Sequence, residues 1–408
     1  MTGSVLLSHP HAGAVAVATA GAFESVNRLA AFVTGLGAVR GTRGGAVLER
    51  MAIRNGSLSN RVLDGIRPGH VVSLGPVEAL SRGVGYLARR AGAGHLTTYD
   101  LLFVTHDLAV SVWSWPRVTD AVYAFEDGAL RTFKRAKERG LKCIWDLPTP
   151  HWSTAEAVWR RESARWAGAM GEAAYAETDW KKRRKDGELA LADVVSVASE
   201  FTRRSLESAG CATPVVVVPY GFPVDQFRQK WKVPEGPFTV LSVGSHDLRK
   251  GTPYLLEAWK RAGLKDARLR LIGPMKLNAS FLAEYAGLFE HVSHVPRRLL
   301  EQEYQHADLL AFPTLGDGFG LVIQEAMCCG TPVVTTPCGG GPECITSGQD
   351  GWLVPERSVD ALVETFRQAA ANRDRLAAMG AAARRRAERW TWRDAGSLLV
   401  RSLGSFGC

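Results

Sequence analysis

Short apolar runs recur along the whole chain and alternate with stretches of helix-like composition. Such runs are typical of parallel strands buried on both faces, because helices cover both sides of such a sheet. The first half has six of them, at Val5–Ser8, Val71–Leu74, Leu101–Thr105, Lys142–Asp146, Val194–Ala198 and Val215–Pro219. The second half has six more, at Phe238–Val243, Arg268–Gly273, His291–Val295, Leu309–Pro313, Pro332–Thr336 and Gly351–Val354. The pattern predicts an α/β fold with two doubly wound domains.

Length and composition agree with two domains. The chain has 408 residues, of which 46% are hydrophobic and 22% charged, so it can bury two cores of about 200 residues each. Residues 221–236 are rich in Gly and Pro and lack a periodic apolar pattern, which predicts a hinge. We therefore expect domains at 1–220 and 237–385, followed by a helical segment at 386–408.

The start of the chain and the cysteines indicate a cytoplasmic protein. Thr2–Phe23 carries no formal charge, but polar residues and Pro10 interrupt it and no basic segment precedes it, so we do not expect a signal peptide or a membrane span. The seven cysteines are odd in number and form no CxxC pair. Reduced thiols are expected, and a zinc site is not.

The segment 313–334, PTLGDGFGLVIQEAMCCGTPVV, joins the end of an apolar strand to the start of a helix. We expect the helix to begin near Phe319, where the first backbone N–H groups have no intrahelical partner. Gly318 and Gly320 have no side chains to shield those groups. The segment therefore predicts a binding site for a pyrophosphate at the helix start.

Two carboxylates flank this predicted phosphate site. Asp317 lies just before the helix and Glu325 lies within it, so they are separated by about 10 Å along the axis at roughly 1.5 Å per residue. Carboxylate oxygens accept hydrogen bonds from hydroxyl groups. Asp317 is thus predicted to bind a sugar and Glu325 a ribose, on either side of the phosphates.

Two cations follow the expected strand at Phe238–Val243. Arg249 and Lys250 stand directly before Gly251 and the start of a helix. Positive charge is unfavourable at a helix N-terminus, so an ordinary basic turn explains these residues poorly. Fixed cations here would stabilise a departing diphosphate without a metal ion.

Histidines follow several expected strands of the first half. They are His9 and His11 in SHPHAG, His106 in VTHD, and His151 in LPTPH. Ligands of open α/β sheets bind at the carboxyl ends of the strands, so these histidines are candidate site residues. A local hydrogen-bonding role is the alternative for each of them.

The net charge of +9 includes a basic run, KKRRK, at Lys181–Lys185. A solvated helix end is the simpler interpretation. The alternative is a peripheral contact with an anionic membrane, where each Lys or Arg contributes about 1 kcal/mol, or with an acidic acceptor. A nucleic-acid partner is not expected, because no recognition motif accompanies the charge.

Segment 313–334 resembles the donor-site signature of glycosyltransferase family 4, a family of retaining GT-B glycosyltransferases. Three further segments are similar to that family, namely VVVVPYGFPVDQF at 215–227, VGSHDLRKGTPYLLEAW at 243–259 and GPECITSGQDGWLVP at 341–355. The resemblance implies two Rossmann-like domains that face a central cleft. It also implies that segment 386–408 packs back on the first domain, where Trp390 and Trp392 would anchor it.

The resemblance also implies roles for individual residues. The expected donor-binding residues are Gly13, Ser245, Arg249, Lys250, Asp317, Gly318, Phe319, Gly320, Leu321 and Glu325. Those expected to be catalytic are His151, Lys250 and Asp317, while the base would lie at Val295 and the acceptor near His9, His11 and His106. Asp317 stands where the family usually has Glu, and Ser245 where it has Arg, so Arg249 is the candidate to replace that phosphate contact.

The predicted activity is transfer of a sugar from a UDP-, GDP- or ADP-linked donor to a hydroxyl group of a glycan, a lipid-linked acceptor or a small molecule. The resemblance implies retention of the anomeric configuration, with no metal or other cofactor. Closure of the two domains would exclude water from the donor. The alternatives are another GT-B enzyme, such as a sugar-nucleotide epimerase or a phosphorylase, a non-catalytic sugar-nucleotide-binding protein, and a basic nucleic-acid binder.

Overall fold

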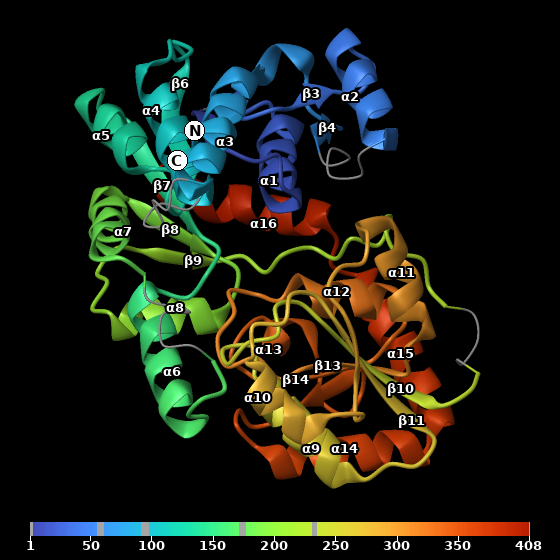
Figure 1. Cartoon of the computed structure of the whole chain (residues 1–408). Helices are drawn as coiled ribbons and strands as arrows, with labels where there is room; N and C mark the ends of the chain where they lie inside the picture. The colour runs from blue at the N-terminus through green and yellow to red at the C-terminus, as the bar shows by residue number, and fades with distance from the viewer. Residues whose placement is uncertain (1–2, 55–60, 91–97, 171–176, 231–234, 408) are drawn as a thin grey trace.

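Each half of the chain folds around its own parallel β-sheet. The computed structural model describes residues 3–54, 61–90, 98–170, 177–230 and 235–407 (Figure 1). The sheet of the N-terminal domain has the spatial order β5 (Val71–Ser73), β2 (Leu29–Thr34), β1 (Ser4–His9), β6 (Thr119–Phe125), β7 (Lys142–Leu147), β8 (Val194–Val197) and β9 (Val215–Val217). That of the C-terminal domain has the order β12 (Glu290–Val292), β11 (Ala267–Ile272), β10 (Phe238–Val243), β13 (Leu309–Phe312), β14 (Val333–Thr335) and β15 (Gly351–Leu353).

Both sheets are doubly wound, which confirms the predicted fold class. In each sheet the strand order reverses beside the first strand of the domain, β1 or β10, as it does in Rossmann folds. All paired strands of both sheets are parallel. A separate pair, β3 (Ala38–Val39) and β4 (Val62–Leu63), lies in the N-terminal domain.

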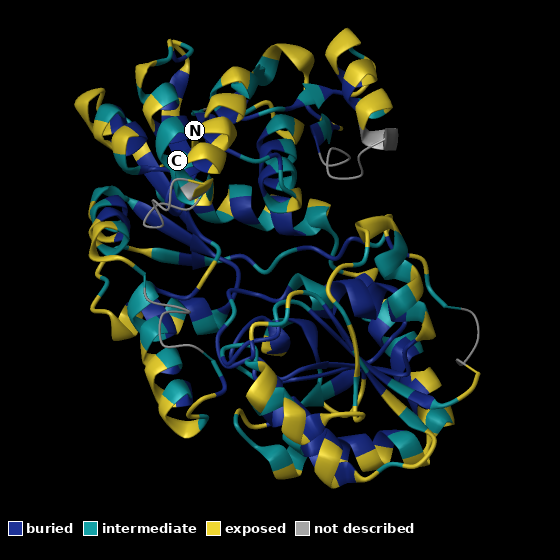
Figure 2. Ribbon diagram, viewed as in Figure 1, coloured by how far each residue is buried: buried dark blue, intermediate teal, exposed yellow. Residues whose placement is uncertain are grey.

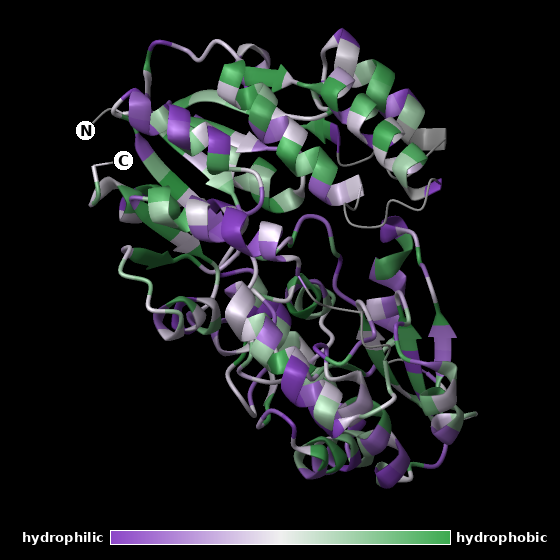
Figure 3. Cartoon of the chain, turned by 60° about the vertical axis from the view of Figure 1, so that its left-hand side comes forward, coloured by the Kyte–Doolittle hydropathy of each residue, from purple (hydrophilic) through white to green (hydrophobic). Residues whose placement is uncertain are grey.

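Helices cover the sheets and bury their apolar faces. Those of the N-terminal domain are α1 (Ala14–Ser25), α2 (Arg43–Arg54), α3 (Gly75–Arg90), α4 (Thr98–Val112), α5 (Leu130–Glu138), α6 (Trp152–Arg165), α7 (Asp179–Leu191) and α8 (Glu200–Ser208), with a 3-10 turn at Pro68–His70. Those that follow are α9 (Thr252–Ala262), α10 (Ala279–Leu282), α11 (Arg297–His306), α12 (Leu321–Cys328), α13 (Gly341–Cys344), α14 (Val359–Ala371), α15 (Arg373–Ala387) and α16 (Trp392–Gly404), with a 3-10 turn at Ala283–Tyr285. The strands are largely buried (Figure 2) and the helices carry both hydrophobic and hydrophilic residues (Figure 3).

The strand predicted at Leu101–Thr105 is wrong, because these residues lie inside α4. A short apolar run has no periodicity that separates a buried strand from a buried helix. The strand missed as a result is β6, which pairs with β1 at the centre of the sheet. Strand β2, which pairs with the other edge of β1, was missed as well. In the second half a strand was predicted at His291–Val295, but β12 ends at Val292, so Val295 lies outside it.

Helix α6 belongs to the first half of the sequence but packs on the C-terminal domain. Val158 and Ala169 share one hydrophobic cluster with the core residues of that domain, and Figure 1 shows α6 beside it. The carboxylate of Glu162 is fully buried. It accepts hydrogen bonds from the Tyr254 hydroxyl and the Arg357 guanidinium, each at 2.6 Å. These contacts hold the two domains together on one side of the molecule.

The chain also crosses between the domains at two other places, residues 219–222 and residues 390–392, and these two crossings touch each other. The backbone N–H of Phe222 donates to the Trp390 carbonyl at 2.8 Å, and the Trp390 indole donates to the Pro219 carbonyl at 3.2 Å. A Cβ atom on Gly221 would lie 2.2 Å from the backbone nitrogen of Trp392. Only glycine therefore fits where the two crossings touch.

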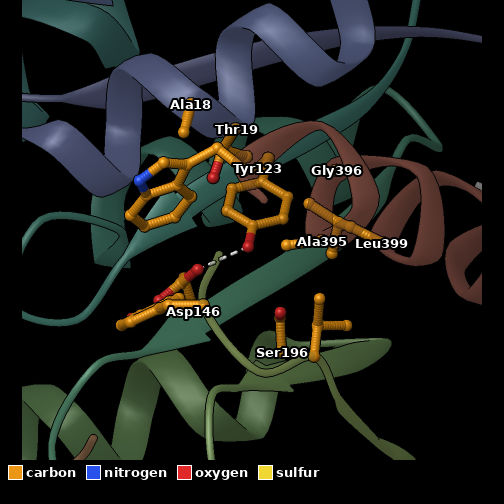
Figure 4. Close-up of a pocket in the computed structure, with 11 residues that line it drawn as sticks. Ala18, Thr19, Tyr123, Asp146, Ser196, Ala395, Gly396 and Leu399 are labelled. Atoms are coloured by element: carbon orange, nitrogen blue, oxygen red, sulfur yellow. Dashed lines mark hydrogen bonds between the residues drawn. The ribbon is translucent and has the colours of Figure 1, made fainter. Parts of the chain in front are cut away.

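Beyond this crossing, α16 packs against α1 of the N-terminal domain, where Leu399 and Leu403 join its core. A cavity of about 30 Å³ remains between α1, α16 and the sheet (Figure 4). The Tyr123 hydroxyl points across it to the carboxylate of Asp146. Burial raises the pKa of Asp146 to about 7, although the hydrogen bond from Tyr123 opposes that shift.

We expect Gly221→Ala to destabilise the protein, because its Cβ would collide with backbone that cannot move without opening the crossing. A loss of about 2 to 3 kcal/mol is typical of overpacking. Thermal or denaturant unfolding measures it. Gly83→Ala is the matched control, since its Cβ meets nothing within 4 Å in the middle of α3, and alanine there should stabilise by about 0.5 kcal/mol. Equal stability of the two variants would contradict the close contact.

The raised pKa of Asp146 predicts a pH-dependent loss of stability. Between its usual pKa and about 7, the folded protein keeps a proton that the unfolded chain releases, so the free energy of unfolding falls as pH rises through this range. Asp146→Asn cannot ionise. We expect the Tm difference between Asp146→Asn and wild type to be more positive at about pH 8 than at about pH 5. A difference that is the same at both pH values would show that Asp146 titrates normally.

Candidate functional site

A pocket of about 340 Å³ lies between the two domains, at the carboxyl ends of their strands. Val15 and Pro148 line it from the N-terminal domain, and Tyr220 from the linker. The C-terminal domain contributes Val243, Gly244, Ser245, Lys250, Phe312, Asp317, Phe319, Gly320, Leu321 and Val322. Ligands of open α/β sheets bind at this edge. Six of the predicted donor-site residues thus meet in one pocket, namely Ser245, Lys250, Asp317, Phe319, Gly320 and Leu321.

The central feature of this pocket is an ion pair between Lys250 and Asp317. The Lys250 ammonium contacts the Asp317 carboxylate and lies 5.2 Å from the centre of the Phe312 ring. The two side chains are 16% and 20% exposed, so both remain accessible from the pocket. Burial alone would raise the pKa of Asp317, but the charges of Lys250 and Arg249 outweigh it and the pKa lies below its usual value. The carboxylate is therefore ionised at neutral pH.

The loop that carries Lys250 is shaped by Asp247, a residue that the sequence analysis missed. Its carboxylate accepts hydrogen bonds from the Lys250 backbone N–H at 2.9 Å and from the Ser245 hydroxyl at 3.1 Å. An aspartate three residues before a backbone N–H is a common turn signal. Gly251 ends the loop with φ +69°, and a Cβ there would lie 2.0 Å from the Pro313 carbonyl oxygen.

Arg249 supports the loop that carries Asp317. Its guanidinium donates to the Gly316 carbonyl at 2.7 Å, and the side chain does not line the pocket. In this arrangement Arg249 fixes the backbone beside Asp317. Its positive charge still acts on the Asp317 carboxylate.

The two glycines predicted to leave room for a phosphate, Gly318 and Gly320, have different surroundings. The prediction that Gly318 leaves room for a phosphate is corrected here, because the N-terminal domain fills that space. A Cβ on Gly318 would lie 1.8 Å from the Pro148 carbonyl oxygen, and the Ser199 hydroxyl donates to the Gly318 carbonyl at 2.6 Å. Gly320 lines the pocket with φ +92° and caps α12. The helix thus begins at Leu321, two residues later than predicted.

Glu325 lies next to the pocket without lining it. Its carboxylate accepts hydrogen bonds from the Tyr304 hydroxyl at 2.7 Å and from the Arg297 guanidinium at 3.1 Å. These bonds connect α12 to α11. Arg297 is the first residue of α11 and stands two residues after Val295. Val295 itself packs against the hydrophobic core and does not line the pocket.

The histidines predicted on the acceptor side lie outside the pocket. His9 packs its ring against Phe125, with 4.6 Å between ring centres, and His11 packs 5.8 Å from Phe103. Burial lowers the pKa of His9 to about 3 and that of His11 to about 4, so both rings are neutral. Gly13 caps α1 two residues before Val15, which lines the pocket.

His106 does not follow a strand as predicted. It lies within α4, is 1% exposed, and its Nε2 is 3.2 Å from the Ser8 hydroxyl. Burial lowers its pKa to about 3. These contacts place His106 in the interior of the N-terminal domain.

His151 lines a different pocket from Lys250 and Asp317. It caps the start of α6, three residues after Pro148, and its Nδ1 accepts from the Ser153 backbone N–H at 3.3 Å. The segment from Pro148 to His151 thus joins the two pockets. The structure does not bring His151 to the residues with which it was predicted to act.

The basic run at Lys181–Lys185 is mostly paired with carboxylates inside the N-terminal domain. Lys181 contacts Asp100 and Asp127, Lys182 contacts Glu156, Arg184 contacts Asp107, and Lys185 contacts Glu126 and Glu177. Arg184 and Lys185 are buried. The run is therefore neither a solvated helix end nor a free surface for an anionic membrane, because neighbouring acids neutralise most of it.

The described residues show no metal cluster and no membrane-spanning helix. Within the described ranges, no three His, Cys, Asp or Glu side chains are grouped so that they could hold a metal ion. No helix in those ranges has the length and hydrophobicity to cross a bilayer. Six cysteines are free thiols, and Cys408 lies outside the described residues.

Comparison with known proteins shows similarity in both sequence and fold. Residues 223–386 match the family model of glycosyl transferases group 1. The chain is 32% identical over 238 residues to the GDP-mannose-dependent alpha-(1-6)-phosphatidylinositol monomannoside mannosyltransferase of Mycolicibacterium smegmatis, a match that covers 52% of this chain and 62% of that protein. It is 31% identical over 302 residues to the D-inositol 3-phosphate glycosyltransferase of Mycobacterium sp. (strain KMS), covering 65% of each. The chain thus spans about three fifths of the curated relatives it matches.

Solved structures match along the whole chain. HepE of Anabaena, in complex with UDP and glucose, covers 98% of this chain and 99% of its own with a TM-score of 0.63 and 15% identity. The sucrose-phosphate synthase of Thermosynechococcus elongatus covers 99% of both chains with a TM-score of 0.64 and 17% identity. At this identity the likeness shows the fold. The chain thus has the GT-B fold along its length, and its residues 223–386 are similar to the glycosyl transferases group 1 family.

Proposed function

We propose that this protein is a glycosyltransferase that moves a sugar from a nucleoside-diphosphate sugar to a hydroxyl group of an acceptor. The Lys250–Asp317 pair in the pocket between the domains is the observation that carries the proposal. An ammonium group and an ionised carboxylate, side by side and accessible, suit a ligand with both phosphates and hydroxyls. The match of residues 223–386 to the family model of glycosyl transferases group 1 supports the same activity.

The donor would lie with its phosphates between Lys250 and the start of α12. The first backbone N–H groups of α12 have no intrahelical partners, so they would point toward an anion bound at that end. Gly320 and Leu321 line the pocket at this position. Asp317 would accept hydrogen bonds from the sugar, and Glu325 from the ribose after rearrangement of its bonds to Arg297 and Tyr304.

The transfer step follows from the same charges. Negative charge grows on the diphosphate as the glycosidic bond breaks, and the Lys250 ammonium would stabilise it without reorganising. We propose that the acceptor hydroxyl attacks from the face of the leaving group, with retention of configuration. Its proton would pass to the departing phosphate oxygen, so no metal ion is required. The apolar walls formed by Val15, Tyr220 and Phe312 would keep water from the donor.

The names of the relatives suggest which substrates to test. The relative of Mycolicibacterium smegmatis is named for GDP-mannose and a phosphatidylinositol mannoside, whereas HepE was solved with UDP and glucose. The higher sequence identity to the former favours a guanosine donor for this chain. A polyhydroxylated acceptor fits both named acceptors among the relatives. A lipid-linked one would bring the protein to a membrane surface.

We expect a nucleoside-diphosphate sugar to raise the Tm of the wild-type protein, since a ligand at 100 times its dissociation constant stabilises by about 2.7 kcal/mol. GDP-mannose, UDP-glucose and ADP-glucose are compared in a thermal-shift assay. Lys250→Ala should weaken donor binding about tenfold or more, because it removes a hydrogen bond between charged groups. Lys265→Ala, at an exposed position of the same domain, is the control. An unchanged shift in Lys250→Ala would rule out the assigned donor position.

The stereochemistry of the reaction is tested on the product, and its metal dependence is tested on the reaction rate. With an α-linked donor, we expect NMR of the purified product to show an α-linkage, because attack and departure share one face of the sugar. The rate should be unaffected by EDTA, since Lys250 would supply the charge that a metal ion otherwise provides. A β-linked product would contradict the first statement. Loss of activity in EDTA that added magnesium restores would contradict the second.

A further inference from the structure

The pocket that contains His151 is separate from the one between the domains. It has a volume of about 630 Å³ and lies in the N-terminal domain, between the start of α6, the second half of α7 and the residues that follow α8. Its polar side chains include His151, Ser153 and Asp186, while Trp152, Leu189 and Ala190 are among the apolar ones. A concave surface of this size, lined by both polar and apolar groups, is a candidate ligand site.

His151 presents a hydrogen-bond donor to this pocket. The residue is 6% exposed, and its Nδ1 accepts from the Ser153 backbone N–H at 3.3 Å. Burial lowers the pKa of His151, although Asp186 opposes the shift. Because Nδ1 accepts from the Ser153 backbone N–H and lies 2.8 Å from the Ser153 hydroxyl, the proton of the neutral ring is assigned to Nε2. Nε2 is 3.9 Å from the nearest Asp186 oxygen, which is too far for a hydrogen bond. This N–H group is thus available to a ligand.

Asp186 presents hydrogen-bond acceptors beside that donor. Its Oδ1 accepts from the Trp152 indole N–H at 2.7 Å, which fixes the carboxylate next to the indole. The Asp186 side chain is 51% exposed, and a carboxylate has about four acceptor positions. Among the described residues that line the pocket, Asp186 alone carries a formal charge.

We propose that this pocket binds a sugar ring of the acceptor, in a subsite beyond the one that receives the transferred sugar. Neighbouring ring hydroxyls both donate and accept, so one can accept from His151 Nε2 and the next can donate to Asp186. The C–H groups of the ring would pack on the indole edge and on Leu189. An anion would be repelled by Asp186, and a cation would face the N–H group of His151. This assignment replaces the catalytic role predicted for His151.

The position of the pocket fits an extended acceptor. Pro148 lines the pocket between the domains and His151 lines this one. They are three positions apart in the sequence, and three extended residues span about 11 Å at most. An acceptor with two or more sugar rings could therefore reach both pockets. In this sense the inference rests on the proposed transfer, although saccharide binding here can be measured without it.

Cys211 provides a direct readout of this pocket. It lines the pocket and is half-buried, whereas the other described cysteines are buried. The experiment measures the alkylation rate of Cys211 by iodoacetamide in the full chain, with peptide mass spectrometry to resolve each site. The probes are methyl α-mannoside, methyl α-glucoside and their α-linked disaccharides, with glycerol and inorganic phosphate for comparison. A saccharide at ten times its dissociation constant should slow the alkylation about tenfold.

Asp186→Asn should remove most of this protection, and Trp152→Phe should reduce it because it frees the carboxylate. Asp179→Asn, an exposed position on the same helix, is the matched control and should be protected like the wild type. Thermal unfolding, together with the Cys211 rate without ligand, shows whether each variant is folded. The proposal is overturned if no saccharide slows the reaction, if glycerol or phosphate protects equally, or if folded Asp186→Asn keeps full protection.

The result is independent of donor binding. If saccharides do not protect Cys211 but a nucleotide sugar still raises the Tm, the acceptor subsite is excluded and the proposed transferase activity still stands. If saccharides protect Cys211 but no nucleotide sugar raises the Tm, the transferase activity is excluded and the pocket is a saccharide site without that function.

Discussion

The arrangement of the two domains depends on close backbone contacts that only glycine permits. At Gly318 the loop that carries Asp317 lies directly under the Pro148 carbonyl, and at Gly221 the linker touches the start of α16. The Ser199 hydroxyl adds a hydrogen bond to the Gly318 carbonyl. Since Pro148 and Asp317 both line the pocket between the domains, these contacts set its shape. Any opening of the domains must therefore move the Asp317 loop relative to the N-terminal domain.

In both domains cations form ion pairs with neighbouring carboxylates, although the chain as a whole is basic. Lys250 pairs with Asp317 at the pocket, while Lys185 pairs with Glu126 and Glu177 in the interior of the N-terminal domain. The first pair is accessible from the pocket, and in the proposed function it would meet the ligand. The second is largely buried, so it supports structure. The net charge of +9 thus gives little information about partners, because the contacts of each cation decide what it can bind.

The sequence was sufficient to predict the fold class and six of the residues that meet in the pocket between the domains. Strand runs in the second half are short, apolar and separated by turns, and the residues that meet at the pocket belong to two local motifs around Lys250 and Asp317. The first half was harder. Leu101–Thr105 has the composition of a strand but lies in α4, and the acids that neutralise Lys181–Lys185 include residues far away in sequence, such as Asp107 and Glu126. Only the folded structure shows these pairings.

This difference between the two halves has a physical origin. Recognition of a diphosphate needs a helix start and a cation, which a short motif can encode. The proposed acceptor subsite, in contrast, is formed by side chains from several elements, among them His151, Asp186 and Cys211. The segment from Pro148 to His151 links the two, because one end lines each pocket. In the proposed arrangement, substitutions in the elements around this segment would change which acceptor binds while the donor motif stays intact.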